Sequence, residues 1–176
     1  MPASKMVKHI LDDMKKTNEE LWKKGIVRDA KGASVKQTGS DSWEISFSGK
    51  NDSGSIILDK HITATRIIEV LLENLQYTLL LYDKGIIQAE YEISNDKIVK
   101  ERLVFMKKHN KIWDFKEIEA YEAEDKDWFM EEEGVPIMLR IDYAPDDHIE
   151  GEHAATHLTL SNQECCRIPI KGIVTF

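Results

Sequence analysis

The sequence predicts an α+β fold in which an N-terminal amphipathic helix and a second, buried helix pack against a mostly antiparallel, curved sheet. Two observations lead to this prediction. Apolar residues recur at three- and four-residue steps in 6–22 and again in 67–75, which is the helical period. Several later segments alternate apolar and polar residues, which is the period of a strand. The 176 residues can bury one core and show no linker or repeat, so we expect a single domain over 1–176.

The first helix carries its apolar residues on one stripe and ends at Gly25. We expect this stripe to cover the sheet; its members are Met6, Ile10, Leu11, Met14, Leu21 and Trp22. The second helix lies in 62–76, where Thr63 or Thr65 could cap its start. Its dense apolar face predicts that it is well buried, and this face consists of Ile67, Ile68, Leu71, Leu72 and Leu75.

Strands are predicted before and after the second helix. Residues 42–47, "SWEISF", alternate and are expected to form a hairpin with "SIILD" at 55–59. The segments "YTLLLY" and "IIQAEYEI" flank Asp83-Lys84-Gly85, which indicates a second hairpin with a positive φ at Gly85. Further strands are expected in four segments: "KIVKERLVFM" at 97–106, "IMLRIDYAP" at 137–145, "HLTL" at 157–160 and "CRIPI" at 166–170.

Residues 117–134, "EIEAYEAEDKDWFMEEEG", are strongly acidic and contain Trp128 and Phe129. Such a run is typical of a solvated loop or short helix, and the alternative is a docking segment for a basic partner. The glutamates Glu90, Glu92 and Glu101 lie on predicted strands and belong to no complete nuclease motif. We therefore expect them to face solvent.

The charge balance, 24 basic against 32 acidic residues and a net charge of −8, disfavours nucleic-acid binding, although a local basic groove would still permit it. The two cysteines are adjacent and exclude a disulfide framework, which fits a reducing compartment. No apolar run approaches the roughly 20 residues of a membrane span, and the N-terminus lacks the apolar core of a signal peptide. We expect a cytoplasmic protein that does not bind a membrane.

His153 and His157 are four residues apart and would share a face on either a helix or a strand. Such a pair can bind zinc, but the glutamate that metalloproteases carry between the two histidines is missing here. A third ligand would have to come from Asp142, Asp146, Asp147, His148, Glu152 or Cys165. Structural histidines, acid/base or phosphate-contacting histidines, and a metal site remain as alternatives. We predict no metal and no cofactor.

Arg167 lies in a segment suited to burial, where a guanidinium usually pairs with a carboxylate or is directed at an anionic ligand. Asp142 is the expected internal partner. Arg167 together with a histidine could also activate Cys165 or Cys166 as a nucleophile, whereas a strand cysteine is more often a small buried apolar residue.

The register of the last hairpin decides whether His157 and Arg167 meet. With Leu160 opposite Cys165, Arg167 lies on the other surface of the sheet from His157. With Leu160 opposite Glu164, His157 faces Arg167 directly and the two could bind an anion. The residues alone leave both registers open.

Three motifs near the C-terminus carry a resemblance to a known family: R-x-D-Y, H-x-x-x-H-L and C-R-I-P. Their residues are Arg140, Asp142, Tyr143, His153, His157, Leu158, Cys166, Arg167, Ile168 and Pro169. Over its last two-thirds the chain resembles the bacterial domain-of-unknown-function family numbered 2290. The resemblance implies no reaction, but it implies a bacterial protein and, for some members, a place in defence-related gene cassettes. Relatives continue into a phenylalanine-rich helix, so it also implies that this chain is either shortened or lacks that C-terminal helix, and an exposed strand edge would invite a partner.

Two functions from different classes follow. We expect a non-enzymatic interaction or accessory subunit of a bacterial intracellular complex, which binds a protein partner or a second copy of itself. The alternative is a small hydrolase or nucleic-acid-processing enzyme in which His153 and His157 serve as acid and base or metal ligands and Arg167 stabilises an anion. The first is preferred because His153, His157, Arg167 and Asp142 do not form a complete catalytic set.

Overall fold

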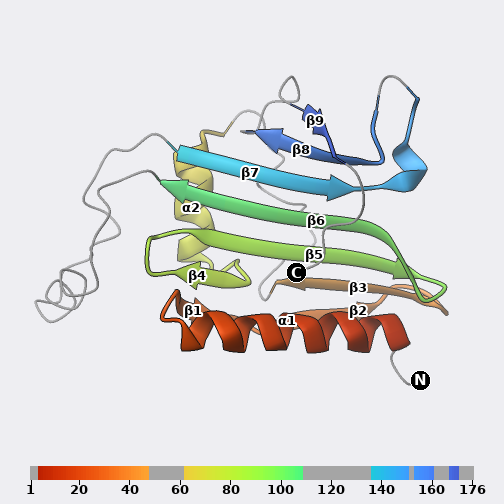
Figure 1. The fold of residues 1–176 in the computed structure, drawn as a ribbon, viewed down its shortest axis with the longest axis horizontal. Helices are drawn as coiled ribbons and strands as arrows, with labels where there is room; N and C mark the ends of the chain where they lie inside the picture. The colour runs from red at the N-terminus through yellow and green to blue at the C-terminus, as the bar shows by residue number, and fades with distance from the viewer. Residues whose placement is uncertain (1–3, 48–61, 109–135, 151–152, 161–166, 171–176) are drawn as a thin grey trace, which may run out of the picture.

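The computed structural model describes residues 4–47, 62–108, 136–150, 153–160 and 167–170. In these residues two helices accompany one sheet whose strand pairs are all antiparallel, which confirms the predicted α+β class (Figure 1). The helices are α1 (Lys5–Lys23) and α2 (Ala64–Glu73), and a short 3-10 turn, η2, spans Pro145–Asp147. The strands are β1 (Val27–Ala30), β2 (Ala33–Gln37), β3 (Ser42–Phe47), β4 (Leu79–Leu81), β5 (Ile86–Ser94), β6 (Lys97–Lys108), β7 (Pro136–Tyr143), β8 (Thr156–Leu160) and β9 (Arg167–Pro169).

The sheet follows the order β1-β4-β5-β6-β7-β8-β9, and β3 pairs with β5 on the same side as β4. The predicted hairpin of β4 and β5 is confirmed. β3 pairs with β2 and β5, whereas its expected partner at 55–59 lies outside the described residues. β1 and β2 were not predicted, because these short strands contain few large apolar residues and show little alternation.

α1 ends where predicted, just before Gly25, and its start is capped by Ser4. The Ser4 hydroxyl accepts a hydrogen bond from the Val7 amide at 3.1 Å, and Gly25 follows the helix with a φ of +67°. The prediction that Trp22 belongs to the buried stripe was wrong, since this side chain is 54% exposed. Leu21 packs against the cluster around Val27, and consecutive residues on a helix point about 100° apart, so Trp22 lies off this stripe.

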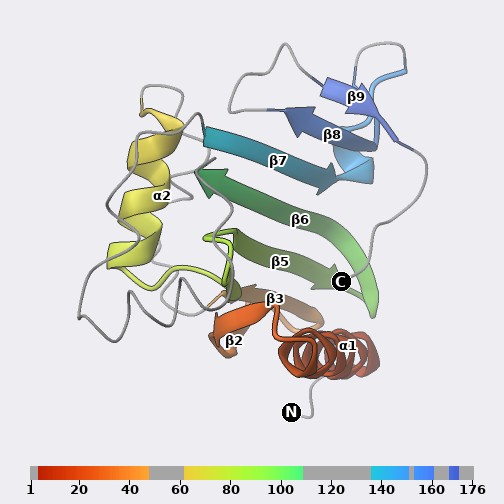
Figure 2. The ribbon, with the colours of Figure 1, turned by 60° about the vertical axis from the view of Figure 1, so that its left-hand side comes forward.

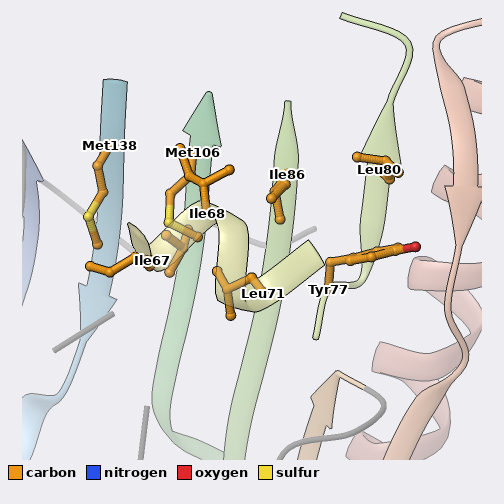
Figure 3. Packing of buried hydrophobic residues seen from close by; sticks show 9 residues of the cluster. Ile67, Ile68, Leu71, Tyr77, Leu80, Ile86, Met106 and Met138 are labelled. Atoms are coloured by element: carbon orange, nitrogen blue, oxygen red, sulfur yellow. The ribbon is translucent and has the colours of Figure 1, made fainter. Parts of the chain in front are cut away.

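α2 starts at Thr63, whose hydroxyl accepts a hydrogen bond from the Arg66 amide at 3.3 Å. The buried contacts of α2 come from Ile67, Ile68 and Leu71, which pack against Ile86, Met106 and Met138 of the sheet (Figure 3). The predicted apolar face is shorter than expected. Leu75 lies beyond the helix end with a φ of 53° and is 51% exposed.

The turn between β4 and β5 differs from the prediction in one detail. The positive φ, 66°, belongs to Lys84 and not to Gly85. Gly85 is needed for space instead, because a Cβ there would lie 2.8 Å from a ring carbon of Phe105.

The two helices cover opposite faces of the sheet (Figure 2). α2 packs on the face that carries Ile86, which we call the α2 face. α1 packs on the face that carries Ala89 and Tyr91, together with Ile45 of β3, and we call it the α1 face. Because side chains alternate along a strand, the pairing register assigns each position of β5–β9 to one of these faces.

Candidate functional site

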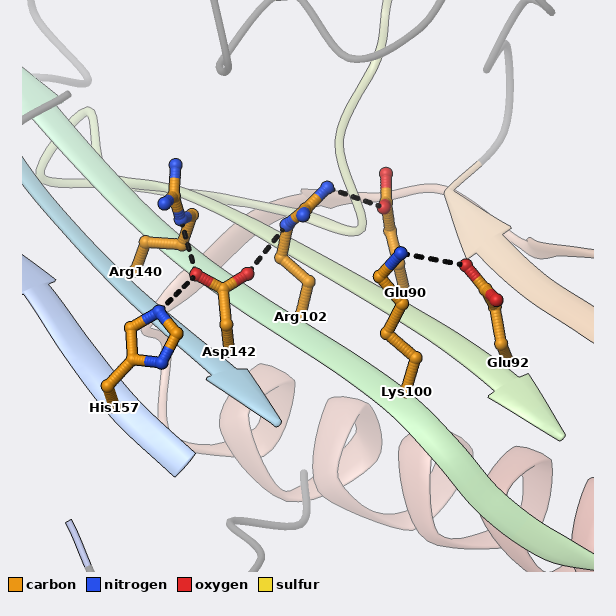
Figure 4. Close-up of polar contacts among 7 residues, drawn as sticks. All are labelled: Glu90, Glu92, Lys100, Arg102, Arg140, Asp142 and His157. Atoms are coloured by element: carbon orange, nitrogen blue, oxygen red, sulfur yellow. Dashed lines mark hydrogen bonds and ion pairs between the residues drawn. The ribbon is translucent and has the colours of Figure 1, made fainter. Parts of the chain in front are cut away.

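Charged side chains gather in the middle of the α2 face. The register places Glu90 opposite Arg102, Arg102 opposite Asp142 and Asp142 opposite His157, so four neighbouring strands contribute to one row (Figure 4). Arg140, two residues before Asp142, lies on the same face. We call these residues the charge cluster: Glu90, Arg102, Arg140, Asp142 and His157.

Asp142 is the centre of the charge cluster. The Nε atoms of two arginines donate to its carboxylate, Arg102 to Oδ1 at 2.9 Å and Arg140 to Oδ2 at 2.6 Å. Arg102 also approaches Glu90, with Nη1 3.6 Å from Oε2. Burial opposes the ionisation of Asp142, but the attraction of Arg102 and Arg140 and their hydrogen bonds outweigh it and lower the pKa of the carboxyl group. Asp142 is therefore an ionised, buried ligand for two guanidinium groups.

The predicted partner of Asp142 was Arg167, whereas the contacts of Asp142 within the described residues come from Arg102, Arg140 and His157. The reason is the register, which sets Arg102 directly across from Asp142. Arg167 is opposite Thr159, and its side chain lies outside the described part of the structure.

Both registers considered for the last hairpin were wrong. His157 is opposite Pro169, which shifts β9 by one residue from the register with Leu160 opposite Cys165 and by two from the other. Arg167 is therefore paired with Thr159 and not with His157. Cys165 and Cys166 lie outside the described residues, as does the acidic segment 117–134.

The two histidine rings lie close together, but they do not share one helix or strand: His153 forms an isolated bridge with Ile149, and His157 lies on β8. The ring of His153 meets that of His157 edge-on, with 5.0 Å between the ring centroids. His157 is 4% exposed, its Nε2 lies 3.5 Å from Asp142 Oδ2, and its Nδ1 lies 3.3 Å from the carbonyl oxygen of Ala154. Both ring nitrogens of His157 therefore face acceptors of the protein itself.

Metal binding finds no support in the part of the chain that the structure describes. No group of three His, Cys, Asp or Glu side chains there could hold an ion. His148, one of the suggested third ligands, has its Nδ1 2.7 Å from the carbonyl oxygen of His153, and Asp146 and Asp147 are exposed. Glu152 and Cys165 lie outside the described residues.

The prediction that all three strand glutamates face solvent was wrong for Glu90 and Glu101. Glu90 is 8% exposed within the charge cluster, whereas Glu92 is exposed and pairs with Lys100 at 3.4 Å. Glu101 is 1% exposed on the α1 face, and neither carboxylate oxygen has a hydrogen-bond partner among the described residues. Burial raises the pKa of Glu101 from 4.5 to about 7.

A simple sequence signal could have found Glu101. It shares the period-two pattern of Leu103 and Phe105, and those two side chains pack in the clusters that α1 covers. The alternation along this strand therefore predicts that the Glu101 carboxyl group lies on the same, apolar face as Leu103 and Phe105.

The part of the α1 face on β7, β8 and β9 carries large apolar side chains that neither described helix covers. Ile137 is 38% exposed, Leu160 37% and Ile168 47%. Their neighbours in the register are also apolar, with Leu139 opposite Leu160 and Leu158 opposite both Ile141 and Ile168. We call this surface the apolar strip, and it consists of Ile137, Leu139, Ile141, Tyr143, Leu158, Leu160 and Ile168.

Neither described helix packs against the apolar strip. The clusters that contain α1 end at β6, and those that contain α2 lie on the opposite face. Figure 1 shows α1 along the β1–β3 side of the sheet, away from β7, β8 and β9. A continuous apolar surface of this kind on a folded protein commonly marks an interaction site.

The fold and these features define an α+β protein with an open antiparallel sheet, a buried charge cluster on one face and an apolar strip on the other. Residues 26–176 match the model of a family described as an uncharacterised conserved protein, DUF2290, and the chain belongs to that family. No curated protein and no solved structure matches the chain. Among the described residues no helix has the length and apolar character needed to cross a membrane.

Proposed function

We propose that this protein is a non-enzymatic interaction or accessory subunit that binds a protein partner through the apolar strip. The observation that carries the proposal is the exposure of Ile137, Leu160 and Ile168 on one continuous surface. Removing apolar surface from water is worth about 25 cal/mol per Å², so covering these half-exposed side chains would favour association by roughly 1 kcal/mol each.

The partner packs on the face of the sheet and does not extend its edge. β9, the last strand in the order, has three residues, and one of them is Pro169. Proline has no backbone N–H and makes an edge strand a poor template for an added strand. The open edge expected from the sequence is therefore a weaker attachment point than the apolar strip beside it.

In the proposed function, the charge cluster has a structural role and not a catalytic one. An acid/base histidine must reach the substrate, whereas His157 is buried and both of its ring nitrogens face acceptors of the protein. Opposite charges on paired strand positions specify one register, because a slip by one residue would bury unpaired charges. The cluster thus aligns β5–β8 and thereby positions the apolar strip.

We propose that this protein and its partner form a bacterial intracellular complex, and that the partner is encoded beside this gene in a defence-related cassette. This part of the proposal rests on the family resemblance. Co-expression with each flanking gene tests it. We expect one neighbour to co-purify with the wild-type protein, and the double variant Leu160→Asp/Ile168→Asp to recover at least about tenfold less of it, because each change places a charge in an apolar contact.

The matched control is Leu75→Asp, which alters a leucine that is 51% exposed, beyond the end of α2 and away from the apolar strip. This variant should recover as much partner as the wild type, and circular dichroism should show all three proteins folded. Equal recovery by the folded double variant, or a monomeric protein with no partner among the neighbours, would show that the proposal is wrong.

A further inference from the structure

We infer that the partner places a single amphipathic helix on the apolar strip, with lysine or arginine residues at the end that lies near the β7–β8 connection. This inference rests on the proposed function and adds the shape and charge of the occupant. Three features of the described residues support it: the size of the strip, the helix already bound on the same face, and the acidic residues at one end.

The size of the strip fits one helix. On β7 the strip runs from Ile137 to Tyr143, and at about 3.3 Å per residue these six steps make it roughly 20 Å long. Three adjacent strands about 4.8 Å apart span roughly 10 Å, which matches the width of one helix with its side chains. At a rise of about 1.5 Å per residue, a helix of roughly 13 residues covers this length.

α1 shows how this face accepts a helix. It has 19 residues and buries Val7, Ile10 and Met14, which follow the three- and four-residue spacing of one helical stripe. These side chains contact the β3–β5 part of the α1 face, and the apolar strip continues the same face across β7–β9. A second helix on the strip would lie beside α1 with the β6 row between them.

Charge indicates the chemistry of one end of the occupant. The connection between β7 and β8 carries Asp146, Asp147 and Glu150, which are exposed. None of these carboxylates forms an ion pair with a residue in the described part of the chain. They lie beyond Tyr143, at the end of the apolar strip where this residue pairs with Thr156. Basic residues on the occupant would complement them, and the net charge of −8 acts in the same direction.

Three synthetic peptides of 18 residues test the inference by fluorescence anisotropy. The first is an amphipathic helix of leucine and lysine, the second has glutamate in place of lysine, and the third scrambles the first so that no apolar stripe remains. We expect only the first to bind the wild-type protein. Leu160→Asp should weaken its binding about tenfold, and Leu75→Asp should leave it unchanged.

The acidic residues are tested by the triple variant Asp146→Asn/Asp147→Asn/Glu150→Gln. Binding of the leucine–lysine peptide should fall about threefold and lose part of its salt dependence, because exposed charges act weakly and are screened. The inference is wrong if the glutamate or scrambled peptide binds equally well, if Leu160→Asp or the triple variant has no effect, or if no peptide binds.

A second copy of the chain is the competing occupant. Sedimentation would then show a wild-type dimer that becomes monomeric in Leu160→Asp, and this result would also overturn the helix inference. Failure of the proposed function is a different result. If the peptides fail to bind while the strip variants still lose the co-purifying partner, the helix inference falls and the proposed function stands.

Discussion

Replacing Glu101 by glutamine is expected to abolish a pH-dependent loss of stability of about 3 kcal/mol. Burial raises the pKa of this carboxyl group from 4.5 to about 7 in the folded protein. Between these values the folded state keeps a proton that the unfolded state has released, so the stability of the wild type falls as the pH rises through this interval. Below pH 4.5 both states are protonated and the penalty vanishes.

Urea unfolding of the wild type and Glu101→Gln at pH 4.5 and pH 8 measures this effect. From pH 4.5 to pH 8, the free energy of unfolding of the variant should rise by about 3 kcal/mol relative to that of the wild type. A fixed cost of burying the amide is the same at both pH values and does not change this difference. Glu92→Gln is the matched control, because this glutamate is an exposed neighbour paired with Lys100 and should show little pH-dependent difference. If Glu101→Gln changed the free energy of unfolding equally at both pH values, Glu101 would not be a buried carboxyl group without a compensating partner.

Asp142→Asn is expected to destabilise the protein by about 3–5 kcal/mol at pH 7, since breaking a buried ion pair leaves its partners uncompensated. Here the loss would leave two guanidinium groups, of Arg102 and Arg140, without the carboxylate to which both donate. The amide of asparagine keeps the size of the side chain, so the change reports on charge and hydrogen bonding and not on packing.

The stability effect of Asp142→Asn depends on pH in a different way from that of Glu101→Gln: it becomes smaller in acid. The pKa of Asp142 is lowered in the folded protein, so the stability it contributes is present above the unfolded pKa and is lost as the pH falls through the folded pKa. The gap between wild type and variant, measured by urea unfolding, should therefore narrow in acid below about pH 4. Lys100→Met, which breaks the exposed pair with Glu92, is the control and should cost less than about 1 kcal/mol. A similarly small loss for Asp142→Asn would show that the charge cluster does not support the sheet.

Local patterns predicted the elements that present one clear face. The two helices follow from the spacing of Ile10 and Met14 and of Ile67 and Leu71. The long strands β5, β6 and β7 follow from alternation and from the turn at 83–85. β1 and β2 were not predicted from the sequence, because an edge strand such as Ala33–Gln37 is mostly exposed and needs few apolar residues.

The candidate sites depended on pairing between distant strands, which local patterns do not set. Asp142 and His157 were recognised from their types and spacing, but Arg102 became the partner of Asp142 only through the register of β6 with β7. The apolar strip shows the same limit. Alternation marks Ile137, Leu139 and Ile141 as one face. The position of α1 over β3 and β5 decides that neither described helix covers this part of it.

The central claim, that the apolar strip is where the partner binds, is tested most directly by photo-crosslinking in the purified complex. The photoreactive residue p-benzoylphenylalanine would replace Leu160, Ile168 or, as the control, Leu75. We expect covalent products with the partner from positions 160 and 168 and none from position 75. Products from position 75 with none from positions 160 and 168 would contradict this claim.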